Sequence, residues 1–247
     1  MKKILTALAM AVLIASCAPK QGPVTDVQTL KSPDGNMEMT FQLTSEGTPQ
    51  YALNYGDQKV ILPSNLGFDF RGVLKAQQLV YNADGTISKE DRQPVYSFHD
   101  GFAVESVETA SFDETWETVW GEERYIRNHY CELTAHLLHQ SGTEMDVVFR
   151  VFDDGFAFRY VFPSNADSMI VMDEKTEYQF VSEPQAWSIP WRTEYYEALW
   201  TREPISQKDT TCSPITLELA EGGYAFLHEA NLTDYPAENF YYRGNTI

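Results

Sequence analysis

Hydrophobic and polar residues alternate along several short stretches of the chain, and a period of two residues predicts β-strands. The pattern is clearest between residues 145 and 162, where polar turn residues at 153–155 separate two alternating runs. The apolar positions of these runs are Met145, Val147, Phe149 and Val151, followed by Phe156, Phe158, Tyr160 and Phe162. We predict an antiparallel hairpin with a three-residue loop in which Gly155 takes a positive φ.

Four aromatic side chains on one face of a single strand require a broad apolar layer opposite them, which indicates a sheet packed on a sheet. The segment 125–140 alternates well enough for a strand but could also be read as a helix, and its strand-forming neighbours favour the strand. No long helix is expected after the amino terminus. The predicted fold class is all-β, one large antiparallel β-sandwich. Alternation predicts its other strands at 37–43, 51–55, 59–62, 215–219 and 224–228.

The first residues form a targeting signal. Two lysines precede an apolar run at 4–15 that is too short to span a bilayer. Residues 14–17 (Ile-Ala-Ser-Cys) resemble a bacterial lipobox, which implies cleavage before Cys17 and a lipid anchor on it; a plain secretory signal is the alternative. We therefore divide the chain into a signal peptide (1–16), a lipidated cysteine with its tether (17–24) and a β-sandwich domain (25–247). The anchor implies a membrane-bound lipoprotein on the periplasmic side of the bacterial envelope, with the outer membrane favoured.

Charge excludes one class of partner. The formal net charge is −18 and no cluster of lysines and arginines is present, so we expect no binding to nucleic acid, whose phosphates require such clusters. Aromatic residues make up 13% of the chain, which suits both a β-rich core and surfaces that stack on sugars. Cys131 and Cys212 either form a disulfide in an oxidising compartment or remain two buried thiols, and the sequence leaves both alternatives open.

Common catalytic motifs are missing from the sequence. There is no nucleophile elbow, no phosphate-binding glycine loop and no pair of cysteines two residues apart. The pair His228-Glu229 begins like a zinc-protease helix, but Leu232 occupies the position of the second histidine. His136 and His139 are three residues apart, so on a strand they point to opposite faces and cannot share a metal.

The remaining candidates are carboxylates among aromatic residues. Glu194 and Glu197 lie in the block 187–200, which also contains Trp187 and Trp191. Aromatic rings offer flat apolar faces to the C–H faces of a sugar, whereas carboxylates bind hydroxyls or a hard cation such as calcium. The same residues also fit surface acids beside core aromatics.

Several blocks of the sequence resemble the amino-terminal domain of glycoside hydrolase family 97, a bacterial family of α-glucosidases and α-galactosidases. They occur in family order over nearly all of the predicted mature chain. The blocks are 32–35, 64–67, 120–122, 149–160, 173–177, 196–200 and 228–235.

The resemblance implies a large β-sandwich similar to galactose mutarotase, followed in the family by a (β/α)₈ barrel that carries the catalytic acid and the base or nucleophile. It also implies that Glu197 matches a glutamate that helps to coordinate calcium at the barrel active site, with Glu194 as the neighbouring alternative. The chain ends at Ile247 before any barrel strand, so we expect a sandwich truncated near its carboxy-terminal end. We expect no catalytic residue and no hydrolysis by this chain alone.

Three functions follow as hypotheses. The first is the carbohydrate-associated domain of a calcium-dependent α-glycosidase, whose partner is an oligosaccharide with α-linked glucose or galactose. The second is a free-standing lipoprotein that holds oligosaccharides on Trp187, Trp191 and Glu194. The third is a mutarotase-like sugar epimerase, which would need a histidine and a glutamate facing one pocket. Its candidate acids are His99, His129 and His228.

Overall fold

A computed structural model describes residues 26–71, 83–84, 95–163, 170–192, 195, 197–233 and 235–247. The predicted signal peptide, Cys17 and the tether therefore lie outside the described residues. Regular structure in the described part consists of β-strands and one short 3-10 helix, η2 (Ile205–Gln207). None of its helices has the length and apolar character that crossing a membrane requires.

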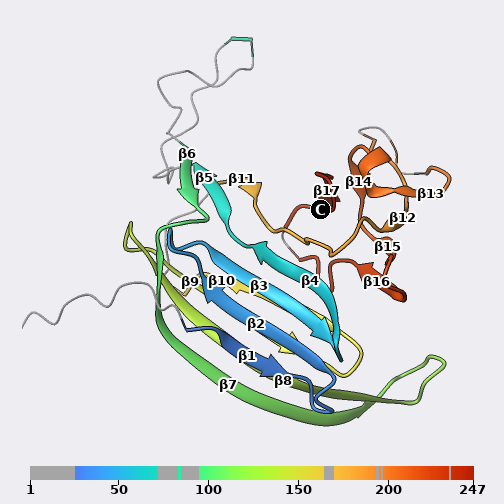
Figure 1. Cartoon of the computed structure of the whole chain (residues 1–247), viewed down its shortest axis with the longest axis horizontal. Coiled ribbons are helices and arrows are strands. Elements are labelled where there is room, and N and C mark those ends of the chain that lie inside the picture. The colour runs from blue at the N-terminus through green and yellow to red at the C-terminus, as the bar shows by residue number, and fades with distance from the viewer. Residues whose placement is uncertain are drawn as a thin grey trace, which may run out of the picture.

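Two antiparallel four-stranded sheets form the main body of the molecule and face each other in Figure 1. The first has the order β1-β2-β3-β4 and the second β10-β9-β8-β7. The strands of the first are β1 (Gln28–Lys31), β2 (Met37–Leu43), β3 (Pro49–Tyr55) and β4 (Gln58–Asn65). Those of the second are β7 (Phe102–Glu117), β8 (Tyr125–His139), β9 (Glu144–Val151) and β10 (Phe156–Val161).

Alternation along these strands creates the core between the two sheets. In β2, every second side chain is buried, beginning at Met37 and ending at Leu43. The ring of Phe41 reaches across to Phe149 of β9, with 5.5 Å between centroids. Tyr51 of β3 stacks on Phe156 of β10 at the same separation. The predicted β-sandwich is confirmed, and so is strand rather than helix for residues 125–139.

Three smaller sheets extend this body. One has the order β11-β5-β6, one β13-β12-β15-β16, and the last pairs β14 with β17. Figure 1 shows the strands β12 to β17 gathered at one side of the main body. Their bounds are β5 (Phe68–Arg71), β6 (Val95–Phe98), β11 (Ile170–Glu174), β12 (Gln185–Ser188), β13 (Thr201–Pro204), β14 (Thr211–Cys212), β15 (Ile215–Glu218), β16 (Tyr224–Leu227) and β17 (Asn239–Phe240).

The side strands pack onto the same core. Leu217 of β15 and Phe240 of β17 are buried in one cluster with Phe149. A bridge joins Gln179 to Leu62 of β4, and a second joins Gln179 to Thr246, so the last residues lie next to the first sheet. Ile247 is buried, and its backbone exchanges two hydrogen bonds with Tyr178.

One detail of the predicted hairpin is wrong. The backbone N–H of Phe152 donates to the carbonyl oxygen of Gly155 at 2.8 Å, so only Asp153 and Asp154 lie between the paired residues. Gly155 is not among the glycines with positive φ, and its carbonyl oxygen is already paired with Phe152 across the turn. The Asp153 carboxylate instead accepts a hydrogen bond of 2.9 Å from the backbone N–H of Asp34, which joins this turn to the β1–β2 turn.

Candidate functional site

Trp187 lies on β12, with its side chain on the outward face of the sheet. Its neighbours Ala186 and Ser188 are buried, while Trp187 is 41% exposed. The strand pairs with β13 on one side and with β15 on the other. Because alternate residues of a strand point to opposite faces, burial of Ala186 in the core directs Trp187 to solvent.

The connection from β12 to β13 carries the other predicted residues. Trp191 is 45% exposed, and its backbone N–H donates to the Thr210 carbonyl oxygen at 2.9 Å. Glu197 is exposed and belongs to no strand, so the sheet edge begins at Thr201 and not within the block 196–200. Glu194 lies outside the described residues.

Glu197 has one property that a calcium ligand needs. Its exposed carboxylate makes no hydrogen bond or ion pair with other described residues, so both oxygens are available to an incoming cation. Calcium takes six to eight oxygen ligands. The described part of the chain contains no group of three or more His, Cys, Asp or Glu side chains placed to hold a metal. Glu197 can therefore supply part of a calcium site, while further ligands must come from elsewhere.

A second group of polar residues was missed by the sequence reasoning. Glu174, at the end of β11, accepts hydrogen bonds from Thr176 at 2.7 Å and from the Tyr235 hydroxyl at 2.8 Å. The Tyr160 hydroxyl lies 2.8 Å from the Thr176 hydroxyl. These contacts join two segments that are 61 residues apart in the sequence.

Glu229 and Glu238 complete this carboxylate–tyrosine cluster, which comprises Glu174, Glu229, Glu238, Tyr160, Tyr178 and Tyr235. The Glu229 carboxylate accepts hydrogen bonds from the Ser213 hydroxyl and from the backbone N–H of Glu238. Burial, together with the negative charges of Glu174 and Glu229, raises the pKa of Glu238 to about 7, against the opposing effect of a hydrogen bond from Tyr178. Burial opposes ionisation of Glu229 too, but the two donated hydrogen bonds hold its pKa below the usual value.

The cluster can therefore keep the Glu238 carboxyl group largely protonated just below neutral pH, close to the Glu229 carboxylate whose pKa is lowered. Burial also raises the pKa of the Tyr178 and Tyr160 hydroxyls well above the usual value, so they act as neutral donors. The only sequence signal for the cluster was that both blocks, 173–177 and 228–235, contain acids, with Tyr178 directly after the first block and Tyr235 at the end of the second. Nothing in their spacing showed that the two blocks meet.

The three histidines proposed as epimerase acids lie in different surroundings. His99 contacts Asp69 at 3.1 Å, and His228 lies 3.0 Å from the carbonyl oxygen of its own neighbour Glu229. His129 belongs to β8, and its Nδ1 is buried without a hydrogen-bond partner among the described residues. None of the three histidines lines the cavity found in the described part of the chain. His136 and His139 point to opposite faces of β8, as predicted from their spacing.

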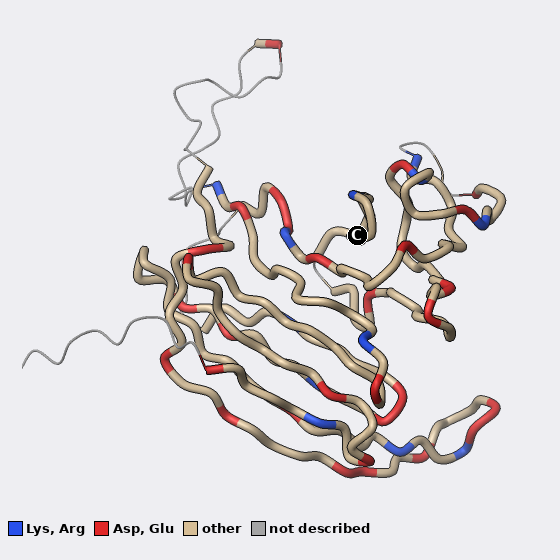
Figure 2. The backbone as a smooth tube through the Cα atoms, in the orientation of Figure 1, with Lys and Arg blue, Asp and Glu red and all other residues tan. Residues whose placement is uncertain are grey.

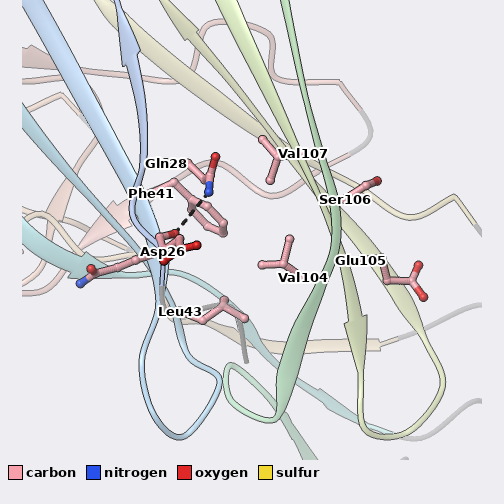
Figure 3. Close-up of a pocket in the computed structure, with 9 residues that line it drawn as sticks. Asp26, Gln28, Phe41, Leu43, Val104, Glu105, Ser106 and Val107 are labelled. Carbon is pink, nitrogen blue, oxygen red and sulfur yellow. Dashed lines mark hydrogen bonds between the residues drawn. The ribbon is translucent and has the colours of Figure 1, made fainter. Parts of the chain in front are cut away.

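A cavity of about 230 Å³ lies between β1–β2 and the beginning of β7. Figure 3 shows Val104 and Val107 directed toward Phe41 and Leu43, whereas Glu105 points away from them. The cavity is a gap at the edge of the sandwich whose lining combines these apolar side chains with polar ones, namely Asp26, Gln28, Gln42, Glu105 and Ser106. It holds no pair of acid and base.

Charge and cysteines add two observations. Figure 2 shows Asp and Glu spread over the molecule with single Lys and Arg residues between them, many of which are paired, such as Arg127 with Asp113 at 2.8 Å. Cys131 and Cys212 are both free and half-buried, so of the two alternatives the structure contains the unpaired thiols.

Comparison with known proteins shows which family has this architecture. The family model described as "Glycosyl-hydrolase 97 N-terminal" matches residues 30–245. This chain belongs to glycoside hydrolase family 97. The sequence resemblance to that family is thereby confirmed, including the all-β fold class.

Solved structures of family 97 enzymes are similar to this chain. Two are forms of an enzyme from Pseudoalteromonas sp. strain K8, one a variant in complex with panose and the other in complex with acarbose. Each is 26% identical, with a TM-score of 0.73, over 89% of this chain and 31% of the enzyme. A β-arabinopyranosidase shares the fold at 19% identity and a TM-score of 0.64, over 81% of this chain and 31% of its own. The family 97 chain thus spans about a third of the length of these enzymes.

Proposed function

We propose that this chain is the carbohydrate-associated amino-terminal domain of a calcium-dependent α-glycosidase and that Glu197 contributes one calcium ligand to a catalytic barrel. The observation that supports it most directly is the family match over residues 30–245. The exposed carboxylate of Glu197, which has no hydrogen-bond or ion-pair partner among the described residues, adds chemical support. When bound, calcium would act as a Lewis acid at the barrel, and this chain would hold it in position.

The chain alone is proposed to be non-hydrolytic. Its proposed substrate partner is an oligosaccharide with α-linked glucose or galactose. Structures of the Pseudoalteromonas relative in complex with panose and with acarbose support an oligosaccharide as the partner. We also propose that Cys17 anchors it to the membrane on the periplasmic side. Turnover of p-nitrophenyl α-glucoside or α-galactoside by the purified chain would overturn the proposal that the chain alone is non-hydrolytic. Mass spectrometry of the membrane-extracted protein would test the lipid on Cys17.

The role of Glu197 can be tested in a chimera. This chain would replace the amino-terminal third of the Pseudoalteromonas enzyme, and calcium-dependent hydrolysis would be measured. We expect Glu197→Gln to raise the calcium concentration needed for half-maximal activity at least tenfold. Glu221→Gln, at another exposed glutamate, should leave it unchanged. Equal behaviour of the two variants would rule out Glu197 as a ligand.

A free-standing oligosaccharide-binding lipoprotein is the second candidate. The exposure of Trp187 and Trp191 favours it, because large aromatic rings at the surface mark binding sites. Calorimetry with malto-oligosaccharides tests this second candidate, because absence of binding by the chain alone would rule it out. Binding at millimolar concentration or tighter by the chain alone supports the second.

A further inference from the structure

The outward face of the sheet β13-β12-β15-β16 carries a row of side chains in register. Arg202 is opposite Trp187, Trp187 is opposite Thr216, and Thr216 is opposite Phe226. Residues directly opposite each other in antiparallel strands point to the same face. The reverse face is the core side, because Ala186 and Leu217 are fully buried there.

This face is open and aromatic. Trp187 is 41% exposed, Phe226 57% and Tyr224 71%. Trp187 and Phe226 are two strands apart, which corresponds to about 10 Å at the usual strand spacing. A short oligosaccharide covers that distance. The His228 ring lies 4.9 Å from the ring of Phe226, just past the end of β16.

Polar side chains are fixed among the rings. Two nitrogens of Arg202 reach the same oxygen of Glu218, each at 2.8 Å, across β12. A third nitrogen of Arg202 lies 3.5 Å from the amide oxygen of Gln185. Guanidinium, carboxylate and amide groups therefore lie on the same face as the aromatic rings, and the two charges cancel locally.

We propose that this face binds a neutral oligosaccharide, whose pyranose rings stack on Trp187 and Phe226 while Arg202, Glu218 and Gln185 bind its hydroxyls. A sugar ring combines apolar C–H faces with hydroxyl groups at its rim, and binding sites that mix aromatic side chains with a few placed polar groups match it. Glu218 counts against a protein partner, because glutamate is depleted at protein interfaces. Since the chain has a net charge of −18, an acidic ligand is disfavoured as well.

The choice of α-linked hexoses as ligand rests on the proposed function. The site is nevertheless tested independently of Glu197. Native gels that contain soluble starch or an α-galactosyl-substituted galactomannan would report binding by retarded migration of the purified chain. Calorimetry with maltoheptaose or with a galactosyl-mannan oligosaccharide would give the dissociation constant.

We expect retardation of the wild-type chain by at least one of the two polysaccharides. Trp187→Ala and Phe226→Ala should each weaken binding by roughly tenfold or more, which is the effect of losing one stacking contact. Trp120→Ala is the matched control, because Trp120 is 88% exposed on the β7–β8 turn, which is not part of this sheet. Unfolding curves would verify that all variants fold.

Absence of retardation in both gels would overturn the proposal, as would equal binding by wild type and both sheet variants. A concentration-dependent dimer that Phe226→Ala abolishes would assign the face to protein contact and also overturn it. None of these outcomes affects the calcium role of Glu197, which the chimera tests separately.

Discussion

The hydroxyl of Tyr51 donates a hydrogen bond of 2.8 Å to the backbone carbonyl oxygen of Glu177. Tyr51 is 1% exposed, and its ring contacts Phe156 and Phe158 of the opposing sheet. The hydroxyl thus fastens the segment after β11 to the centre of the sandwich. Glu177 in turn accepts a hydrogen bond of 3.1 Å from the backbone N–H of Asn65.

Removal of this hydroxyl should destabilise the whole domain. Tyr51→Phe keeps the ring but leaves a carbonyl oxygen without its partner, which costs about 1–3 kcal/mol of unfolding free energy. Tyr55→Phe, on the same strand but 50% exposed, should change it by less than about 0.5 kcal/mol. Urea unfolding followed by tryptophan fluorescence measures both. Equal midpoints for the two variants would show that the hydrogen bond contributes nothing.

Gly67 should tolerate no side chain. Its φ is +137°, and an added Cβ would lie 2.5 Å from the Cα of His99 and 2.8 Å from the carbonyl oxygen of Phe98. Backbone atoms at both contacts cannot move aside easily. We expect Gly67→Ala to lower the unfolding free energy by about 3 kcal/mol or more, from backbone strain and the steric clash together.

Gly142→Ala isolates the effect of backbone strain, so the difference between the two variants gives the steric part. Gly142 also has a positive φ, +85°, but nothing lies within 4 Å of its added Cβ. We expect a loss of about 1–2 kcal/mol from backbone strain alone. Thermal unfolding of the two variants, measured side by side, shows whether close packing around Gly67 adds to the effect of backbone strain. If Gly142→Ala is the more damaging, close packing around Gly67 is not what requires glycine there.

Local patterns in the sequence were sufficient to predict the sandwich. The alternation from Met37 to Leu43 and from Met145 to Phe162 reflects burial on one face only, and each hairpin pairs residues that are close in the sequence. The conformation of Gly155 was missed because a turn of two residues and one of three have the same composition here. Local sequence does not show which backbone groups will pair across a turn.

The candidate site was predictable only in part. Trp187 and Trp191 were named as possible sugar contacts, and the structure places both at the surface. The partners of Trp187 on its sheet, Thr216 and Phe226, depend on strand register across β15 and β16. Glu174 and Tyr235 meet through tertiary packing between segments far apart in the sequence. No period or motif encodes such contacts. They follow only from the complete fold.

Two arginines lie over tyrosine rings, one buried and one exposed. Together they test whether burial of the ring increases the contribution of the arginine to the unfolding free energy. Arg150 lies 4.4 Å from the Tyr130 ring centroid, and its Nε donates to Glu132 at 2.7 Å. Tyr130 is only 7% exposed. Lysine keeps the charge of Arg150 but loses the planar guanidinium, so Arg150→Lys should lower the unfolding free energy by about 1 kcal/mol.

Arg124 is the matched control. It lies 5.4 Å from the Tyr125 ring centroid and pairs with Glu117 at 2.8 Å, but Tyr125 is 59% exposed. We expect Arg124→Lys to change stability by less than about 0.5 kcal/mol, since water screens exposed pairs. Denaturant unfolding at low and at high salt measures both variants. Equal losses would mean that burial of the ring does not matter.

The raised pKa of Glu238 predicts how stability depends on pH. Its folded-state pKa of about 7 lies above the usual 4.5, so between these values the native state binds more protons than the unfolded state. The stabilisation from this group is therefore fully present below pH 4.5 and is lost as the pH rises through 7. The carboxylates of Glu174 and Glu229 face the same group and cause part of the shift.

Glu238→Gln should remove this pH dependence, because the amide stays neutral and can still accept the hydrogen bond from Tyr178. We expect the variant and the wild type to have similar melting temperatures at pH 5, and the variant to melt at a higher temperature at pH 8. Glu221→Gln, at an exposed glutamate, should shift the melting temperature equally at both pH values. A difference between Glu238→Gln and wild type that stays constant from pH 5 to pH 8 would show that Glu238 ionises normally in the folded protein.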